Sequence, residues 1–163
     1  MFIKGGGTMG MEIPSIFDVA EWFLSKSSMT PKKLQKLVYY AYSWTLTLVN
    51  EDEESLEFRL FEDSIPEAWV HGPVFPELYK EYKDYGWQQI PKYEDEVYYF
   101  EEDVEDILEQ VFDVYGSLTG NQLETITHQE EPWLNAREGC GFYQICTNEI
   151  SDIDIYRCYA ARL

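Results

Sequence analysis

The chain has 163 residues, of which 45% are hydrophobic and 17% aromatic, so it has the length of one domain and enough apolar surface for a core. That composition excludes a disordered tail. The 31 acidic and 12 basic residues give a net charge of -19, which opposes binding to nucleic acid or to an anionic membrane. Such a surface either serves only to keep the protein soluble or matches a basic protein partner.

The first residues contain a pattern typical of an untranslated leader. Lys4-Gly5-Gly6 can be encoded by a sequence that includes a bacterial ribosome-binding site, just upstream of the codons for Met9 and Met11. We therefore predict that residues 1–10 are a disordered leader or a mis-called start in a bacterial or phage genome. Residues 11–163 are predicted to form a single domain.

Two helices are predicted next. Ser15 as an N-cap, with Asp18 in the capping-box position, predicts a helix that ends near Ser27. Thr30 as a cap and Pro31 at the first helical position begin a second helix. Its apolar side chains recur at helical spacing, and its first turns hold the only basic cluster of the sequence, Lys32, Lys33 and Lys36. This cluster is either a solvated face or a set of partners for the protein's own acids.

The middle of the chain predicts little regular structure. Leu56–Phe61 and Val97–Phe100 are predicted to be short strands that pair with each other. Between them, residues 64–76 contain three prolines and a glycine, which predicts an irregular, turn-rich segment. Pro76 then begins a short helix over Glu77–Tyr85, which Gly86 ends.

A strongly amphipathic helix is predicted over Glu102–Tyr115, with an apolar stripe on one face. Because its other face has no lysine or arginine, like charges lie unpaired along the helix, and we expect a contact face for a basic partner. The acids on that face include the four that we assign to partner binding: Glu102, Asp106, Glu109 and Asp113. The charge is concentrated in this part of the chain, since residues 91–163 carry 17 acids and four bases.

Three short helices complete the prediction: Gln122–His128, Pro132–Arg137 and a last one that Ser151 caps and Ala160 ends. In the last helix we expect Ile153, Tyr156, Tyr159 and Ala160 to face inward. The predicted fold class is α+β, mostly α: a compact bundle of about five to seven helices with a small two- or three-stranded antiparallel sheet.

The sequence contains few groups arranged for chemistry. It has two histidines and three cysteines, and none of the spacings typical of a serine hydrolase, a phosphate-binding loop or a zinc site. We therefore predict no enzyme activity, no cofactor and no metal, although His71 and His128 leave a metal-dependent enzyme open as an alternative. Free thiols and the absence of an apolar run of ~20 residues predict a cytoplasmic protein.

Two segments are more distinctive. Gly72-Pro73 forces a bend after Ala68-Trp69-Val70-His71, and Pro132 begins a helical turn after Thr127-His128. Trp133 and Arg137 lie four residues apart, and these residue types are common interface anchors, so we assign both to partner binding. We assign structural roles to His71, Gly72, Pro73, His128 and Pro132. In the alternative interpretation Trp133 also fills the core.

These segments resemble the Panacea domain family, also called the SocA-like or phage-associated GepA-like family. The resemblance has three parts: residues 30–44, Ala68-Trp69 with His71-Gly72-Pro73-Val74 and Pro76-Glu77-Leu78-Tyr79, and Thr127-His128 with Pro132-Trp133 and Ala136-Arg137. It implies a mostly helical domain and a role as an antitoxin that neutralises a toxin encoded beside it by direct binding. The acidity after residue 90 departs from the family's pattern.

Three functions follow as expectations. The first is an antitoxin that binds a basic toxin without contacting nucleic acid or membrane. The second is a phage-encoded acidic inhibitor of a host defence nuclease, of the anti-CRISPR type, whose carboxylates replace phosphates. The third is a proteolytic adaptor that delivers its toxin to a protease. The sequence leaves the partner's identity and the oligomeric state open.

Overall fold

The computed structural model describes residues 13–163, and the predicted leader and the predicted domain boundary at residue 11 lie outside these residues. Its first two helices begin where the sequence supplies caps. Helix α1 (Ile16–Lys26) has Ser15 as its N-cap in a complete capping box with Asp18. Helix α2 (Pro31–Val49) has Thr30 as its cap and a proline in its first turn. Both predicted starts are confirmed.

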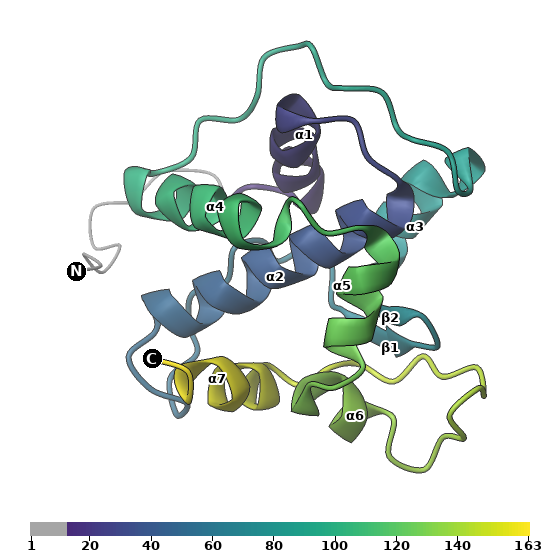
Figure 1. Cartoon of the computed structure of the whole chain (residues 1–163). Helices are drawn as coiled ribbons and strands as arrows, with labels where there is room; N and C mark the ends of the chain where they lie inside the picture. Colours follow the sequence, from purple (N-terminus) through teal and green to yellow (C-terminus); the bar gives the residue numbers. More distant parts are fainter. Residues whose placement is uncertain (1–12) are drawn as a thin grey trace.

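Helix α2 is the centre of the molecule. It crosses the middle of the fold in Figure 1, and helices from both halves of the chain pack around it. Its side chains from Leu34 to Tyr42 are all buried, because neighbouring elements cover the helix on several sides. The remaining helices are α3 (Pro76–Tyr82), the short 3₁₀ helix η1 (Lys83–Tyr85), α4 (Glu102–Tyr115), α5 (Gly120–Thr127), α6 (Glu131–Ala136) and α7 (Asp152–Ala160).

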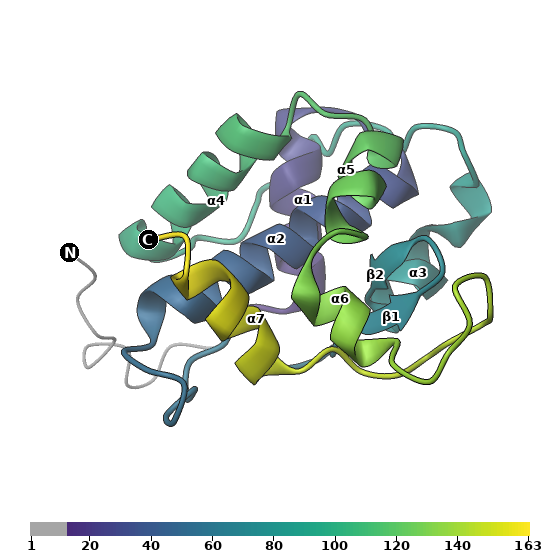
Figure 2. The same ribbon diagram turned by 60° about the horizontal axis from the view of Figure 1, so that its bottom comes forward.

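Seven α-helices and one two-stranded antiparallel sheet within residues 13–163 confirm the predicted fold class. Figure 2 shows α5, α6 and α7 following one another along one side of α2. No helix in this part of the chain combines the length and the apolar character that crossing a membrane requires.

The sheet lies where the sequence predicted irregular structure. Strand β1 (Glu67–Trp69) pairs with β2 (Gly72–Val74), and Val70 and His71 form the turn between them. Pro73 is tolerated in β2 because its partner residue, Ala68, turns its own N–H the other way, to the carbonyl of Asn148 at 2.8 Å. A short hairpin therefore stands where the prolines and the glycine predicted an irregular, turn-rich segment.

The two predicted strands, Leu56–Phe61 and Val97–Phe100, were wrong. The side-chain amide of Asn50 bonds both the N–H and the carbonyl of Phe58, at 3.0 Å and 2.8 Å, and takes the place of a partner strand. The two segments lie side by side, but a pocket of about 200 Å³ separates them instead of a ladder of hydrogen bonds. Leu60, Phe61 and Phe100 of these segments belong to the buried core, and Leu56, Phe58 and Tyr98 pack against it.

The last helix begins at the predicted cap, since Ser151 accepts a hydrogen bond from the N–H of Asp154. Its inward face differs in part from the prediction. Ile155 and Tyr159 are fully buried, whereas Ile153 is 42% exposed. Residues 155 and 159 are four apart and therefore share one face of the helix. Residue 153 is two positions before residue 155, so it lies on the opposite, outer side.

Candidate protein-binding site

The hairpin is fixed to α2 by two polar side chains of the central helix. Gln35 bonds Phe75 on both sides, donating to its carbonyl at 3.1 Å and accepting from its N–H at 2.9 Å. Lys36 donates to the carbonyl of Pro73 at 3.1 Å and is 1% exposed. Burial lowers the pKa of Lys36 to about 7. The hairpin therefore has a defined position relative to the core.

Helix α6 holds the hairpin from the other side. The indole N–H of Trp133 donates to the carbonyl of Trp69 at 2.8 Å, and Arg137 donates to the carbonyl of Ala68 at 2.8 Å. The ring of His128 stacks on Trp133 with ring centroids 4.2 Å apart. Burial lowers the pKa of His128, which favours the neutral ring in this stack. The two family-like segments thus meet at the hairpin.

Trp133 and Arg137 do not have the exposed positions that we expected of partner anchors. They are 2% and 5% exposed, and their polar atoms bond to the protein's own backbone. The alternative, in which Trp133 fills the core, is the arrangement that the structure shows. Arg137 acts beside it as an internal cation, because its guanidinium donates four hydrogen bonds to backbone carbonyls.

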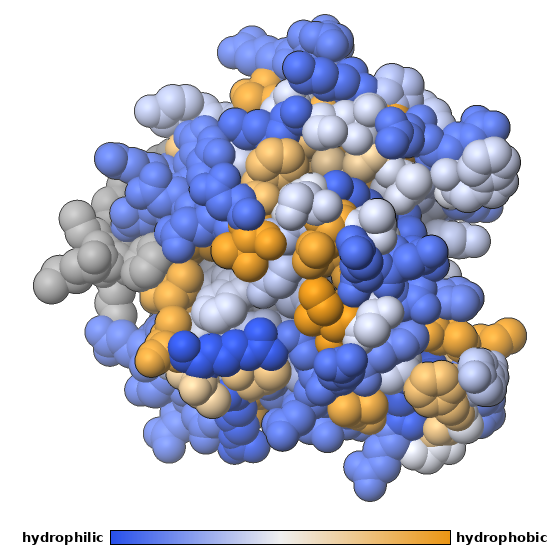
Figure 3. Space-filling model, in the orientation of Figure 1, coloured by the Kyte–Doolittle hydropathy of each residue, from blue (hydrophilic) through white to orange (hydrophobic). Residues whose placement is uncertain are grey.

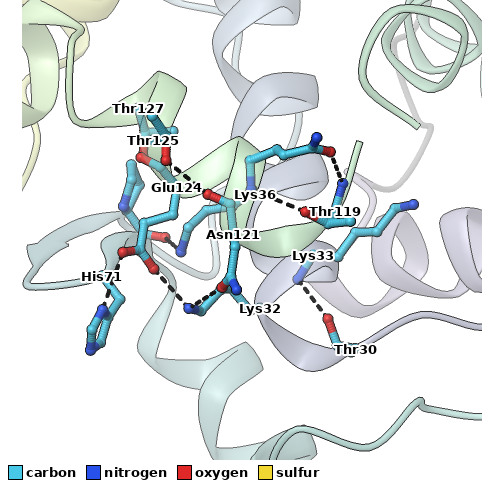
Figure 4. A network of polar contacts seen from close by, with 12 residues as sticks. Thr30, Lys32, Lys33, Lys36, His71, Thr119, Asn121, Glu124, Thr125 and Thr127 are labelled. Carbon is cyan, nitrogen blue, oxygen red and sulfur yellow. Dashed lines mark hydrogen bonds and ion pairs between the residues drawn. The ribbon is translucent and has the colours of Figure 1, made fainter. Parts of the chain in front are cut away.

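A polar network covers the tip of the hairpin (Figure 4). Glu124 of α5 forms an ion pair with Lys32 at 2.8 Å and a longer contact with His71 at 3.3 Å. Burial opposes ionisation of Glu124, but the hydrogen bonds from Lys32 and His71 prevail and lower its pKa. Lys32 also donates to Asn121, and Lys33 donates to the carbonyl of Gly116. The basic cluster of α2 is therefore used within the protein.

A buried carboxylate beside this region was not predicted from the sequence. Glu130 is 6% exposed and accepts hydrogen bonds from Tyr40 at 2.8 Å, Tyr159 at 3.0 Å and Arg162 at 2.7 Å. It ties α6 to α2 and α7. An acid directly before the Glu131-Pro132 helix start resembles an ordinary surface residue, and only the tyrosines of distant segments reveal its role.

The acidic residues of α4 lie on the surface. Glu102, Asp106 and Asp113 are exposed, whereas Glu109 forms an ion pair with Lys26 of α1 at 2.8 Å. Helix α4 and the segment after α6 lie at opposite ends of the molecule in Figures 1 and 2. The structure therefore does not bring the acidic face together with Trp133 and Arg137.

Gly72 is expected to be intolerant of a side chain. Its φ is +101°, and a Cβ atom there would lie 2.8 Å from both Lys36 Cε and Thr127 Oγ1. We expect Gly72→Ala to lower the free energy of unfolding by about 2–4 kcal/mol, because backbone strain and a steric clash add. Urea denaturation measures this change.

Gly86→Ala is the matched control for that prediction. Gly86 also has a positive φ, of +60°, but a Cβ atom there would meet no other atom within 4 Å. Only the backbone contribution applies at this position, so we expect a smaller loss of about 1–2 kcal/mol. Equal losses in the two variants would show that the contact with Lys36 and Thr127 carries no energy.

The described residues contain few side chains arranged for catalysis or metal binding. Across residues 13–163, no three His, Cys, Asp or Glu side chains come close enough together to hold a metal ion. Cys140, Cys146 and Cys158 are free thiols. What the geometry does provide is a rigid hairpin with a helix on each side and a loop after α6, a frame suited to presenting surface residues.

Comparison with known proteins assigns the family. The model of the family described as "Antitoxin SocA-like, Panacea domain" matches residues 34–134, which is more than half of the chain. No curated protein and no solved structure matches. The match runs from α2 to α6 and includes the hairpin, His128 and Trp133, which are the residues that meet in the structure. The chain therefore belongs to the SocA-like antitoxin family and carries its Panacea domain.

Proposed function

We propose that this chain is an antitoxin that neutralises a toxic protein by binding directly to it. The family match over residues 34–134 carries the proposal. The net charge of -19 supports it, because an acidic surface accelerates association with a basic protein. The toxin is expected to be the product of a gene beside that of the antitoxin.

Co-expression tests this function. The adjacent gene is induced in a host cell with and without this chain, and we expect growth to stop in its absence and to resume in its presence. A version with an early stop codon keeps the messenger RNA and removes the protein, and it should not restore growth. Growth that is restored by the stop-codon version, or by neither version, would contradict the proposal.

The fate of the toxin separates direct neutralisation from delivery to a protease. In direct neutralisation the toxin persists at an unchanged level while growth is restored. In the adaptor mechanism its level falls and recovers when the host's proteases are inactivated. Immunoblotting of a tagged toxin during rescue distinguishes the two.

The exposed acids of α4 are proposed to steer the partner. We expect the triple variant Glu102→Gln, Asp106→Asn, Asp113→Asn to slow association with the toxin about three- to tenfold at low salt. The difference should vanish at high salt because counterions screen exposed charges beyond a Debye length. Stopped-flow fluorescence measures the association rate.

A second triple variant controls for net charge alone. Glu94, Asp95 and Glu96 are also exposed and lie in the segment before α4. Their replacement by Gln, Asn and Gln changes the net charge by the same amount at a different place. If both variants slow association equally, the position of the charge on α4 has no special role.

A further inference from the structure

The loop between α6 and α7 exposes three large apolar side chains. Phe142, Tyr143 and Ile145 are 58%, 84% and 85% exposed. Figure 3 shows apolar side chains gathered at the lower right, where Figure 1 draws this loop. We call residues 140–147 the aromatic loop. Single exposed apolar residues are ordinary on a protein surface, but three within four positions indicate a contact surface.

Arg137 holds the aromatic loop in one conformation. The two N–H bonds of its Nη2 atom are shared among three loop carbonyls, those of Gly141 at 2.9 Å, Phe142 at 3.2 Å and Gln144 at 2.7 Å. Because these carbonyls turn toward one buried guanidinium, the apolar side chains are left on the outer side. A further hydrogen bond, from the N–H of Gly141 to the side-chain oxygen of Gln144 at 2.8 Å, closes the turn. A loop that is ordered in advance loses little entropy on binding.

A pocket lies between the aromatic loop and the hairpin. Its volume is about 240 Å³, and its lining includes Trp69, Val74, Ile145 and Cys146. The surface therefore offers both protruding apolar side chains and an apolar hollow beside them. Interfaces with tightly packed anchors use this combination.

The charges around the loop indicate the kind of partner. Glu138 and Glu149 are exposed and lie two residues beyond its two ends. The sequence from residue 138 to 154 has no lysine or arginine. A second copy of this chain would place like charges opposite one another, which disfavours self-association here. A basic protein with an apolar depression matches both the charge and the shape.

We propose that the aromatic loop is the main anchor for the toxin, with Tyr143 and Ile145 inserted into an apolar depression that basic residues surround. Arg137 is a positioning residue for this loop. The inference rests on the proposed function and adds a location to it. In this proposal Tyr143 and Ile145 contact the toxin directly, and Trp133 and Arg137 support them from inside the protein.

Removing the two most exposed side chains of the loop tests the inference. We expect the variant Tyr143→Ser, Ile145→Ser to weaken binding to the purified product of the adjacent gene at least about 100-fold. Surface plasmon resonance measures the affinity. The thermal midpoint should stay unchanged, because neither side chain contributes to the core.

The variant Trp87→Ser, Tyr99→Ser is the matched control. These side chains are 84% and 85% exposed, the same as the tested pair, and lie in the segment between η1 and α4. We expect their loss to leave affinity within about threefold. If the loop variant binds as tightly as the wild type, or the control loses as much affinity, the inference is overturned while the proposed function stands. Failure of the wild type itself to bind overturns both.

Discussion

Replacing Arg137 with methionine is expected to lower the free energy of unfolding by about 2–4 kcal/mol, since the carbonyl of Ala68 is left in the interior without its donor. The guanidinium makes four hydrogen bonds to backbone carbonyls and lies over the Trp133 ring at 5.1 Å. Denaturant unfolding measures the loss. The backbone N–H of Gln144 donates to the carbonyl of Gly141, and its hydrogen exchange should also accelerate as the loop loosens.

Arg157→Met is the control for this result. Arg157 forms an ion pair with Glu53 at 2.6 Å, but its side chain is 61% exposed. Solvent screens an exposed ion pair, so we expect a much smaller loss of stability than in Arg137→Met and no effect on the aromatic loop. Arg137→Lys should not restore the wild type, because one ammonium group cannot reproduce the planar fork of donors. A fully stable Arg137→Met variant would contradict the role assigned to this residue.

Stability is expected to rise by about 1–2 kcal/mol between about pH 7 and about pH 8.5 through Lys36 alone. Burial lowers the pKa of Lys36 from its ordinary value of 10.5 to about 7; Glu124 opposes the shift and Lys32 adds to it. In this range the unfolded chain binds more protons than the folded one. Raising the pH therefore favours the folded state, and the gain ends near the unfolded value.

Lys36→Met removes the titrating group and keeps an apolar stem of similar length. We expect its stability to change little over the same pH range, whatever its absolute value. Urea unfolding at several pH values compares the two slopes. A wild-type slope of zero, or a variant slope equal to that of the wild type, would show that Lys36 remains protonated in the folded protein.

The helices could be predicted from the sequence because their starts are local. Ser15 with Asp18, Thr30 with Pro31, and Ser151 each satisfy N–H groups within the next turn, and the structure places helices at all three. The hairpin could not be predicted, because its edges are satisfied from afar. Asn148, some 80 residues later in the sequence, accepts the N–H of Ala68. The side-chain amide of Asn50 likewise forms hydrogen bonds with the backbone N–H and carbonyl of Phe58, in a segment that was predicted to be a strand.

The candidate site was predicted only in part, for the same physical reason. The segments around His71 and Trp133 were singled out, and the structure brings them together at the hairpin. The burial of Trp133 and Arg137 could not be predicted from residue type. A tryptophan and an arginine four residues apart are equally typical of an interface anchor and of a buried pair that bonds the protein's own backbone. The exposure of the aromatic loop could not be predicted, because periodicity does not show which short apolar runs reach the core.

The most direct test of the account is isothermal titration calorimetry of the wild-type chain with the purified product of the adjacent gene. We predict a complex of fixed stoichiometry whose affinity falls as salt is raised, since both a specific contact and charge attraction contribute. Absence of binding heat at every temperature and salt concentration tried, together with separate elution on size-exclusion chromatography, would contradict the claim that this protein acts by binding a toxin directly.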